Sequence, residues 1–175
     1  MKCIFLDFDG VINNWFHFEG IDLDNANVLK KIIKASGAKV IVTSSTKYEL
    51  EQMPSKDYCH SSFFNTYVKP LNELGIKIFD LTPNIFGNRT LEIQTYIASH
   101  NVEEYVILDD ELVAQSLQPH QVFLELYKGL QECHIIPALN ILNGQLGFYP
   151  PNYNKEETSQ ELVKKINAYY QNKLN

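Results

Sequence analysis

Two closely spaced aspartates, Asp7 and Asp9, follow a short apolar run that starts at Cys3, and Gly10 comes directly after them. Such a run is typical of a buried strand in a parallel sheet, where residues i and i+2 share a face. Two carboxylates held this close repel each other, so a hard cation such as Mg²⁺ is expected beside them. One would be a metal ligand and nucleophile, and the other would move protons. Gly10 would allow a tight turn. The alternative is that these aspartates only form a turn.

Polar residues also follow two other predicted strands. One apolar run ends at Thr43 and Ser44, and another ends at Asp109 and Asp110. Because the carboxyl ends of parallel strands meet at the ligand-binding edge of an open α/β sheet, these side chains are expected to converge with Asp7. Taken alone, Asp109 and Asp110 would also fit a solvated acidic turn.

Four segments together resemble the haloacid dehalogenase (HAD) superfamily from residue 3 to about residue 143. They are Asp7-Phe8-Asp9-Gly10, Val40-Ile41-Val42-Thr43-Ser44-Ser45, Gly87-Asn88-Arg89-Thr90-Leu91-Glu92-Ile93 and Val106-Ile107-Leu108-Asp109-Asp110. In that superfamily a second aspartate at the position of Asp9 accompanies phosphoryl transfer, whereas true dehalogenases lack it.

The sequence resembles in particular the small branch found in RNA-repair "Swiss army knife" proteins. That branch usually has Ser-Ser-Trp-Arg after the second strand and a Lys-Arg-Gly-like start to the third motif. Here the corresponding residues are Ser44-Ser45-Thr46-Lys47 and Asn88-Arg89-Thr90. The change from Trp to Thr46 bears on the substrate more than on catalysis.

The resemblance implies a three-layer, Rossmann-like α/β fold with a central parallel sheet of about five strands, and a phosphatase reaction. Asp7 would attack phosphorus and form an aspartyl-phosphate, while Asp9 would protonate the leaving oxygen and then activate water. Mg²⁺ would be held by Asp7, the backbone carbonyl of Asp9 and Asp109, with Asp110 as a direct or water-mediated ligand. These are the hard oxygen ligands that Mg²⁺ takes.

The phosphoryl oxygens would be held by the backbone amides of Phe8 and Gly10 and by one strand-end hydroxyl, where charge must be stabilised. Thr43 fits the motif if the second strand ends one residue before it, and Ser44 fits if the strand runs one residue further. The sequence leaves this choice open.

Arg89 is the best candidate for the basic residue of the site. It is the only arginine among the 15 basic residues, so arginine is not used generally on this surface. The alternative is a solvated charge near a helix start, in which case Lys47 or Lys69 would supply the positive charge.

The order of elements predicts a single domain, with a core over residues 1–143 and a loop and helix over 144–175 packed on it. Strands are expected at 3–6, 39–42, 76–79, 105–108 and 122–126. Helices are expected from Asp22 or Asp24 to Gly37 and over 67–74, 90–100, 131–142 and 156–174. The stretch 47–66 has no clear pattern, and the aromatic residues from Trp15 to Phe18 suggest a small flap beside the site.

Composition limits the functional classes. The net charge of −6 argues against general nucleic-acid binding. Three cysteines without metal-type spacing suggest free thiols, and no apolar run is long enough to span a membrane. A cytoplasmic location is therefore expected, and the oligomeric state stays open.

The spacing of the motifs leaves no room for a large cap domain. About 30 residues separate the first two motifs and about 45 separate the second from the third. An uncapped site is open to large substrates, so we expect a phosphorylated macromolecule: first a phosphoprotein, given the acidic charge, and second a polynucleotide phosphate end. A non-catalytic phosphate-binding module is the main alternative, although a binder has no need of Asp9. Transfer to another acceptor, as in mutases, would normally need a cap.

Overall fold

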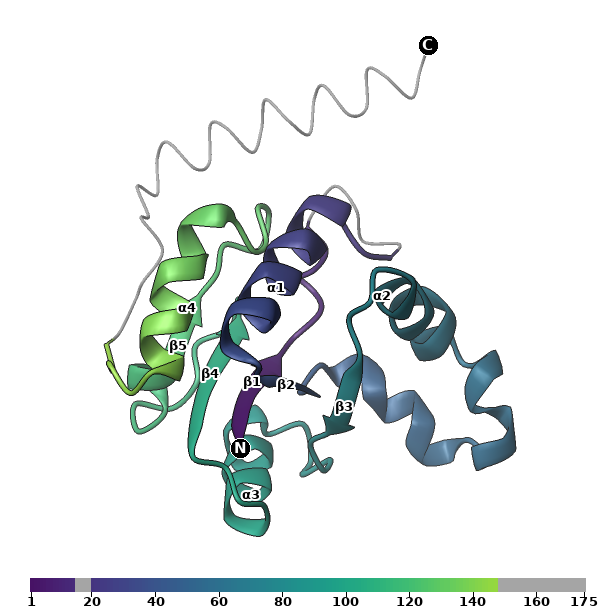
Figure 1. The fold of residues 1–175 in the computed structure, drawn as a ribbon. Coiled ribbons are helices and arrows are strands. Elements are labelled where there is room, and N and C mark those ends of the chain that lie inside the picture. The colour runs from purple at the N-terminus through teal and green to yellow at the C-terminus, as the bar shows by residue number, and fades with distance from the viewer. Residues whose placement is uncertain (15–19, 148–175) are drawn as a thin grey trace.

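The computed structural model describes residues 1–14 and 20–147, which form a parallel β-sheet with helices on both faces (Figure 1). The strands are β1 (Lys2–Leu6), β2 (Lys39–Val42), β3 (Ile78–Leu81), β4 (Glu104–Asp109) and β5 (Gln121–Phe123). The helices are α1 (Leu23–Ser36), α2 (Lys69–Glu73), α3 (Arg89–Ser99) and α4 (Ile135–Leu142). The sheet order is β3-β2-β1-β4-β5, which confirms the predicted five-stranded, Rossmann-like fold.

The strands β2 and β4 lie on either side of the central strand β1 and end near the same height in the sheet. Its last residue, Leu6, is in register with Val42 on one side and with Leu108 on the other. The following N–H of Asp7 donates to the Leu108 carbonyl at 3.0 Å, and the N–H of Thr43 donates to the Leu6 carbonyl at 2.8 Å. The residues that leave these three strands therefore start at one edge of the sheet.

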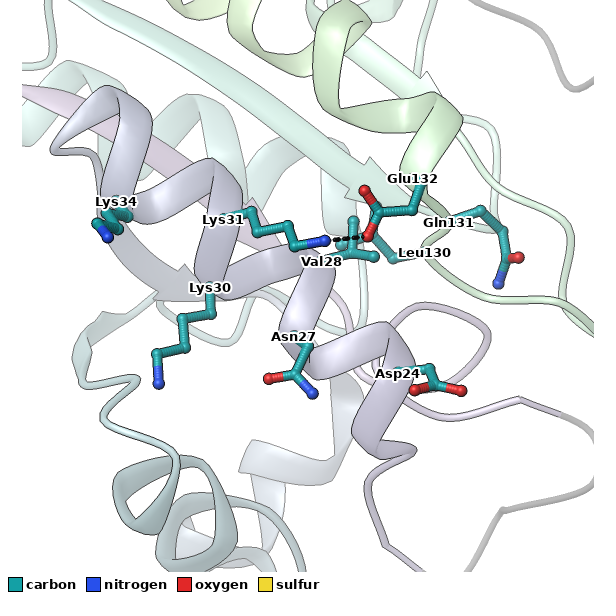
Figure 2. A pocket seen from close by; sticks show the side chains of 9 residues that line it. All are labelled: Asp24, Asn27, Val28, Lys30, Lys31, Lys34, Leu130, Gln131 and Glu132. Atoms are coloured by element: carbon teal, nitrogen blue, oxygen red, sulfur yellow. Dashed lines mark hydrogen bonds and ion pairs between the residues drawn. The ribbon is translucent and has the colours of Figure 1, made fainter.

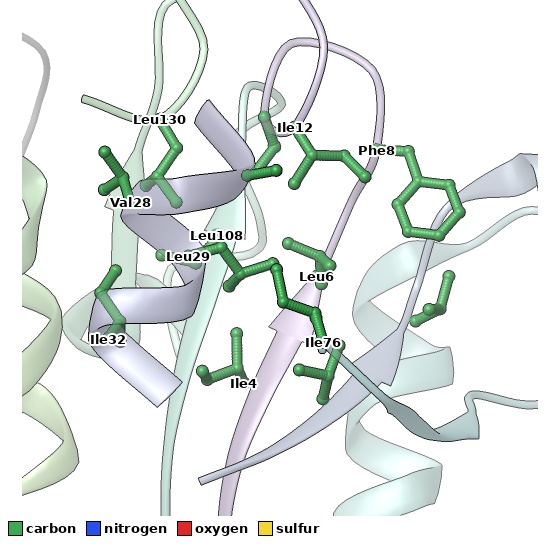
Figure 3. Close-up of a cluster of buried hydrophobic side chains, with 14 of the residues drawn as sticks. Ile4, Leu6, Phe8, Ile12, Val28, Leu29, Ile32, Ile76, Leu108 and Leu130 are labelled. Carbon is green, nitrogen blue, oxygen red and sulfur yellow. The ribbon is translucent and has the colours of Figure 1, made fainter. Parts of the chain in front are cut away.

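Two apolar clusters fill the space between the sheet and the helices on its two faces. The larger one packs α1, α2 and α4 against one face of the sheet, and Figure 3 shows it around Leu6, Leu29 and Leu108. The smaller one packs α3 against the other face through Ile93 and Tyr96. This alternation of strand side chains between two covered faces is what a parallel sheet requires.

Helix ends follow the capping residues that the sequence offers. Asp22 is the N-cap of α1, since its side chain accepts from the N–H groups of Asp24 and Asn25, and α1 ends before Gly37 with φ of +67°. Asn88 caps α3 by accepting from the Leu91 N–H at 3.1 Å. Leu91 is exposed, because Glu92, Ile93 and Tyr96 form the buried side of α3.

The segment between β2 and α2 consists of three short helical turns. They are the 3₁₀ helices η1 (Ser45–Gln52) and η2 (Ser55–His60) and the π-helical turn η3 (Phe64–Val68), which leads into α2. Such short, irregular turns lack the repeating apolar pattern of an α-helix, which explains why the sequence pattern assigned nothing to residues 47–66.

Several predicted boundaries were wrong. The helix predicted over 67–74 begins within the π-helical turn η3 and is α-helical only over Lys69–Glu73. The third strand is Ile78–Leu81 rather than 76–79, because Ile76 is buried against the helices and its N–H donates to the Leu71 carbonyl. The fifth strand, predicted over 122–126, runs from Gln121 to Phe123. The predicted helix over 131–142 begins as a 3₁₀ turn, η5 (Glu132–His134), and is α-helical only from Ile135.

Two predicted features lie outside the described residues: the aromatic flap from Trp15 to Phe18 and the helix over 156–174. Cys3 is buried, Cys59 and Cys133 are exposed, and all three are free thiols. Within residues 1–14 and 20–147, no helix has both the length and the apolar character to cross a membrane.

Candidate active site

Three carboxylates from two strands meet at the carboxyl edge of the sheet. Asp7 leaves the end of β1, Asp109 is the last residue of β4, and Asp110 follows it. Each of the three offers an oxygen within 4.8 Å of the others. Asp7 is only 5 % exposed and Asp109 is fully buried, so these groups are not an ordinary solvated acidic patch.

Arg89 lies against this carboxylate cluster. It is the first residue of α3, and its Nη1 atom is 3.2 Å from Asp7 Oδ2 and also contacts Asp109 Oδ2. The adjacent carboxylates raise the pKa of Arg89 above its already high value despite burial, so it stays charged. The sole arginine of the chain thus supplies positive charge at the place where the sequence predicted it.

The cluster remains short of positive charge even with Arg89 present. Burial, and then repulsion from Asp7, raise the pKa of Asp109 to about 7, although Arg89 opposes the rise. The same two causes raise the pKa of Asp110 to about 6. Burial also raises the pKa of Asp7. These three carboxylates resist being ionised at the same time. Their hard oxygen atoms suit a divalent cation, and a bound cation would favour their charged forms.

We expect this crowding of carboxylates to make stability depend on pH. Without divalent ions, we expect the free energy of unfolding to fall as pH rises from about 5 to about 8. The folded-state pKa values of Asp109 and Asp110 lie above those of an unfolded chain, so the folded protein binds more protons and loses stability as they ionise. Urea unfolding in EDTA at several pH values measures this.

The variant Asp109→Asn isolates the effect from that of other titrating groups. Its stability should fall less over the same pH range, and Mg²⁺ should remove most of the decline in the wild-type protein. An equal decline in the wild-type protein and the variant would show that this cluster is not its source.

Asp9 has different surroundings from the other three aspartates. Its Oδ1 accepts from the Asn13 side-chain amide at 2.7 Å and from the Tyr67 hydroxyl at 3.4 Å. Its carboxylate is not part of the cluster formed by Asp7, Asp109 and Asp110. The predicted metal contact through the Asp9 backbone carbonyl stays a prediction.

Gly10 makes the tight turn that the sequence predicted, with φ of +67°. A Cβ atom at this position would lie 2.6 Å from Asp110 Cγ, so the turn also leaves the space in which that carboxylate sits. The Gly10 N–H donates to Asn13 Oδ1 at 2.9 Å. Asn13 therefore contacts both Gly10 and Asp9.

We expect Gly10→Ala to lower the free energy of unfolding by at least about 1 kcal/mol, because an L-residue is disfavoured at this φ. The added Cβ should also displace Asp110 and weaken Mg²⁺ binding. Urea unfolding and calorimetric Mg²⁺ titration measure the two effects. Gly37→Ala is the matched control, because Gly37 has the same φ of +67° and nothing within 4 Å of the added atom. Equal Mg²⁺ affinities of the two variants would contradict the expectation.

The two strand-end hydroxyls differ in their contacts. Interaction with the Ser44 hydroxyl opposes the burial-driven rise in the pKa of Asp7, and Ser44 Oγ accepts from Thr46 Oγ1 at 3.1 Å. Thr43 Oγ1 is buried and has no hydrogen-bond partner among the residues that the structure describes. Ser44 is thus the hydroxyl in contact with the predicted nucleophile.

The two lysines considered in place of Arg89 lie elsewhere. Lys47 is buried, and its Nζ is 2.8 Å from Glu92 Oε2. Lys69 is exposed at the start of α2. Within residues 1–14 and 20–147, neither lysine forms a hydrogen bond or ion pair with the three carboxylates, whereas Arg89 contacts two of them.

A comparison with protein families shows which family the domain belongs to. The model of the family described as the HAD domain in Swiss Army Knife RNA repair proteins matches residues 3–135. The chain belongs to this family. The match covers the three carboxylates, Arg89 and the strand-end hydroxyls, and it indicates a HAD-type hydrolase. Comparisons with curated proteins and with solved structures gave no match.

Sequence reasoning missed several residues around the site of this HAD domain. Asn13 is six residues after Asp7, but nothing in its type or spacing distinguishes it. Tyr67 reaches Asp9 from a π-helical turn, and such turns often occur at functional sites but have no sequence pattern. Glu92 lies between apolar residues of α3, and its burial becomes visible only in the structure.

The HAD domain also has a surface hollow lined by Lys30, Lys31 and Lys34 of α1 and by Glu132 (Figure 2). Lys31 and Glu132 form an ion pair across it. None of its lining residues belongs to the carboxylate cluster or contacts Arg89, so we assign it no part in the candidate active site.

Proposed function

We propose that this HAD domain is a Mg²⁺-dependent phosphatase that hydrolyses phosphate monoesters through an aspartyl-phosphate on Asp7. The observation that carries the proposal is the meeting of Asp7 and Asp109 from separate strands, within 4.8 Å of Asp110 and in contact with Arg89. Nucleophile, metal ligands and a fixed positive charge are then all present at one edge of the sheet.

In the first step, an oxygen of Asp7 forms a bond to phosphorus as the bond to the leaving oxygen breaks. Arg89, 3.2 Å from Asp7 Oδ2, stabilises the negative charge of the transferring phosphoryl group. The Ser44 hydroxyl, which interacts with Asp7 in this structure, would turn its proton to a phosphoryl oxygen when the substrate is bound. The Phe8 and Gly10 amides stay candidates for the same role, although the Gly10 N–H is bound to Asn13 in this structure.

Asp9 would protonate the leaving oxygen and later take a proton from the water that attacks the aspartyl-phosphate. Asn13 and Tyr67 both donate to its Oδ1, which leaves Oδ2 for the substrate. Burial, followed by the charge of Asp9, raises the pKa of Tyr67 to about 12, so Tyr67 remains a protonated donor at neutral pH.

Asp7, Asp109 and Asp110 would hold the Mg²⁺ ion. When bound, Mg²⁺ supplies charge stabilisation for the phosphoryl oxygens. It would also favour the ionised form of Asp7, which is the form that attacks phosphorus.

A phosphorylated macromolecule is the substrate we propose, and a phosphoprotein is the first candidate because the chain carries a net charge of −6. A polynucleotide phosphate end is the second candidate, and the observation that favours it is the family's description as RNA repair proteins. A non-catalytic phosphate-binding module on the same fold is disfavoured by the presence of Asp9.

A phosphatase screen with Mg²⁺ tests the proposal. It compares a generic aryl phosphate, phosphopeptides, oligoribonucleotides with a 3′- or 5′-phosphate, and small metabolites, with released phosphate as the readout. We expect turnover of the aryl phosphate that EDTA stops and a preference for one of the macromolecular substrates. Phosphate binding without turnover of any substrate would support the non-catalytic alternative instead.

A further inference from the structure

A buried ion pair between Lys47 and Glu92 connects two parts of the candidate active site. Lys47, in η1, and Glu92, in α3, have side chains that are 3 % and 0 % exposed, and Lys47 Nζ lies 2.8 Å from Glu92 Oε2. Burying two charges costs several kcal/mol each, and an apolar pair of similar size is often no less stable. Stability alone is therefore a weak explanation for this pair.

The Lys47 ammonium group is bound on the side of the strand-end hydroxyls. Besides Glu92, it donates to the Thr43 carbonyl at 3.2 Å and to the Ser44 carbonyl at 3.5 Å. These contacts fix the backbone of the two residues whose hydroxyls were predicted to meet phosphate. The Ser44 hydroxyl leaves this same backbone to reach Asp7.

The Glu92 carboxylate connects α3, the helix that begins with Arg89, to neighbouring segments of the chain. Its Oε1 accepts from the Tyr48 hydroxyl at 2.6 Å and from the Ile85 N–H at 3.1 Å, and Thr82 Oγ1 lies 3.5 Å from Oε2. Glu92 comes three residues after Arg89, so the two side chains leave nearly the same side of α3, one turn apart. Fixing Glu92 therefore fixes how α3 is rotated and presents Arg89 to Asp7.

We propose that the buried Lys47–Glu92 pair is a positioning device that holds the Thr43–Ser44 backbone and Arg89 at the separation needed to bind one phosphoryl group. This inference rests on the proposed function, because it takes Arg89 and a hydroxyl of Thr43 or Ser44 to contact phosphate. Neither Lys47 nor Glu92 is expected to touch the substrate. Their effect is transmitted through Ser44 on one side and through α3 on the other.

The test compares Lys47→Met, Glu92→Gln and the double variant with the wild-type protein. Thermal unfolding reports stability, and calorimetric titration with inorganic phosphate in the presence of Mg²⁺ reports affinity. Each single variant should be less stable and bind phosphate more weakly, because it leaves one buried charge uncompensated. The double variant removes both charges, so its unfolding temperature should return close to that of the wild-type protein.

Phosphate affinity in the double variant is the deciding measurement. We expect it to remain at least about ten-fold weaker than in the wild-type protein although stability has recovered, which corresponds to about 1.4 kcal/mol. If affinity returns together with stability, the pair is only structural and the proposal is overturned. The matched control is Lys31→Met with Glu132→Gln, an exposed ion pair on α1 and η5 that should leave affinity unchanged. An equal loss of affinity in this control would also overturn the proposal.

A milder variant serves if the double variant does not fold. Tyr48→Phe removes only the hydroxyl that donates to Glu92 Oε1 and keeps the ring beside Lys47. It should weaken phosphate binding several-fold, and unchanged binding would overturn the proposal. Because phosphate binding needs no turnover, a protein that binds phosphate but hydrolyses nothing would contradict only the proposed function. A wild-type protein that binds no phosphate would contradict both proposals.

Discussion

Asp7→Asn is expected to lower kcat for an aryl phosphate by at least about 10⁴-fold in the presence of Mg²⁺, as loss of a nucleophile does in other enzymes. The substitution keeps the size of the side chain but removes the negative charge that attacks phosphorus. It also removes one of the three carboxylates of the candidate metal site. Initial rates of phosphate release at saturating substrate, with circular dichroism to verify folding, measure the effect.

Asp24→Asn is the control for this variant. Asp24 is an exposed aspartate in the first turn of α1, away from the carboxylate cluster. The kcat of the Asp24→Asn variant should therefore stay close to that of the wild-type protein. Activity in Asp7→Asn equal to that in the control would rule out an aspartyl-phosphate on Asp7.

Arg89→Met is expected to lower kcat/KM by about 10²- to 10³-fold, the usual effect of losing one preorganised charge-stabilising donor. Arg89 is the charged side chain that contacts both Asp7 and Asp109. Arg89→Lys should recover only part of the loss, because a lysine ammonium lacks the planar fork of donors that arginine presents to two oxygens. Steady-state kinetics with one substrate measure kcat/KM, which should fall from the wild-type protein to Arg89→Lys and further to Arg89→Met.

Lys34→Met controls for the loss of a positive charge as such, since Lys34 lies in the last turn of α1 and lines the surface hollow to which we assign no part in the site. It should leave kcat/KM unchanged. If Arg89→Met behaved like this control, the basic residue of the site would have to be sought elsewhere in the chain.

The sheet and the carboxylate cluster were predictable because each depends on local signals. A buried strand that stops at an acidic residue is visible in the sequence, and parallel pairing brings such strand ends to one edge. The register of Leu6 with Val42 and Leu108 then places the residues that follow at one level. The only arginine of the chain was identifiable by its rarity and its position at a helix start.

The contacts around the cluster were not predictable because they depend on tertiary packing. Tyr67 and Asn13 reach Asp9 from segments with no repeating pattern. Lys47 was considered as a substitute for Arg89 as the basic residue of the site, but the structure pairs it with Glu92, a residue that helical periodicity does not mark as buried. The third strand was placed two residues early, because the apolar run at 76–79 continues from a turn packed on the helices into the sheet.

The most direct test of the account is an anomalous difference map from crystals of the protein soaked with Mn²⁺ in place of Mg²⁺. The account predicts one strong peak bonded to side-chain oxygens of both Asp7 and Asp109, at roughly the 2.1 Å expected for a small divalent cation. A map in which no peak joins these two aspartates, or in which their side chains point to different sides of the sheet edge, would contradict the shared metal site and the phosphatase mechanism built on it.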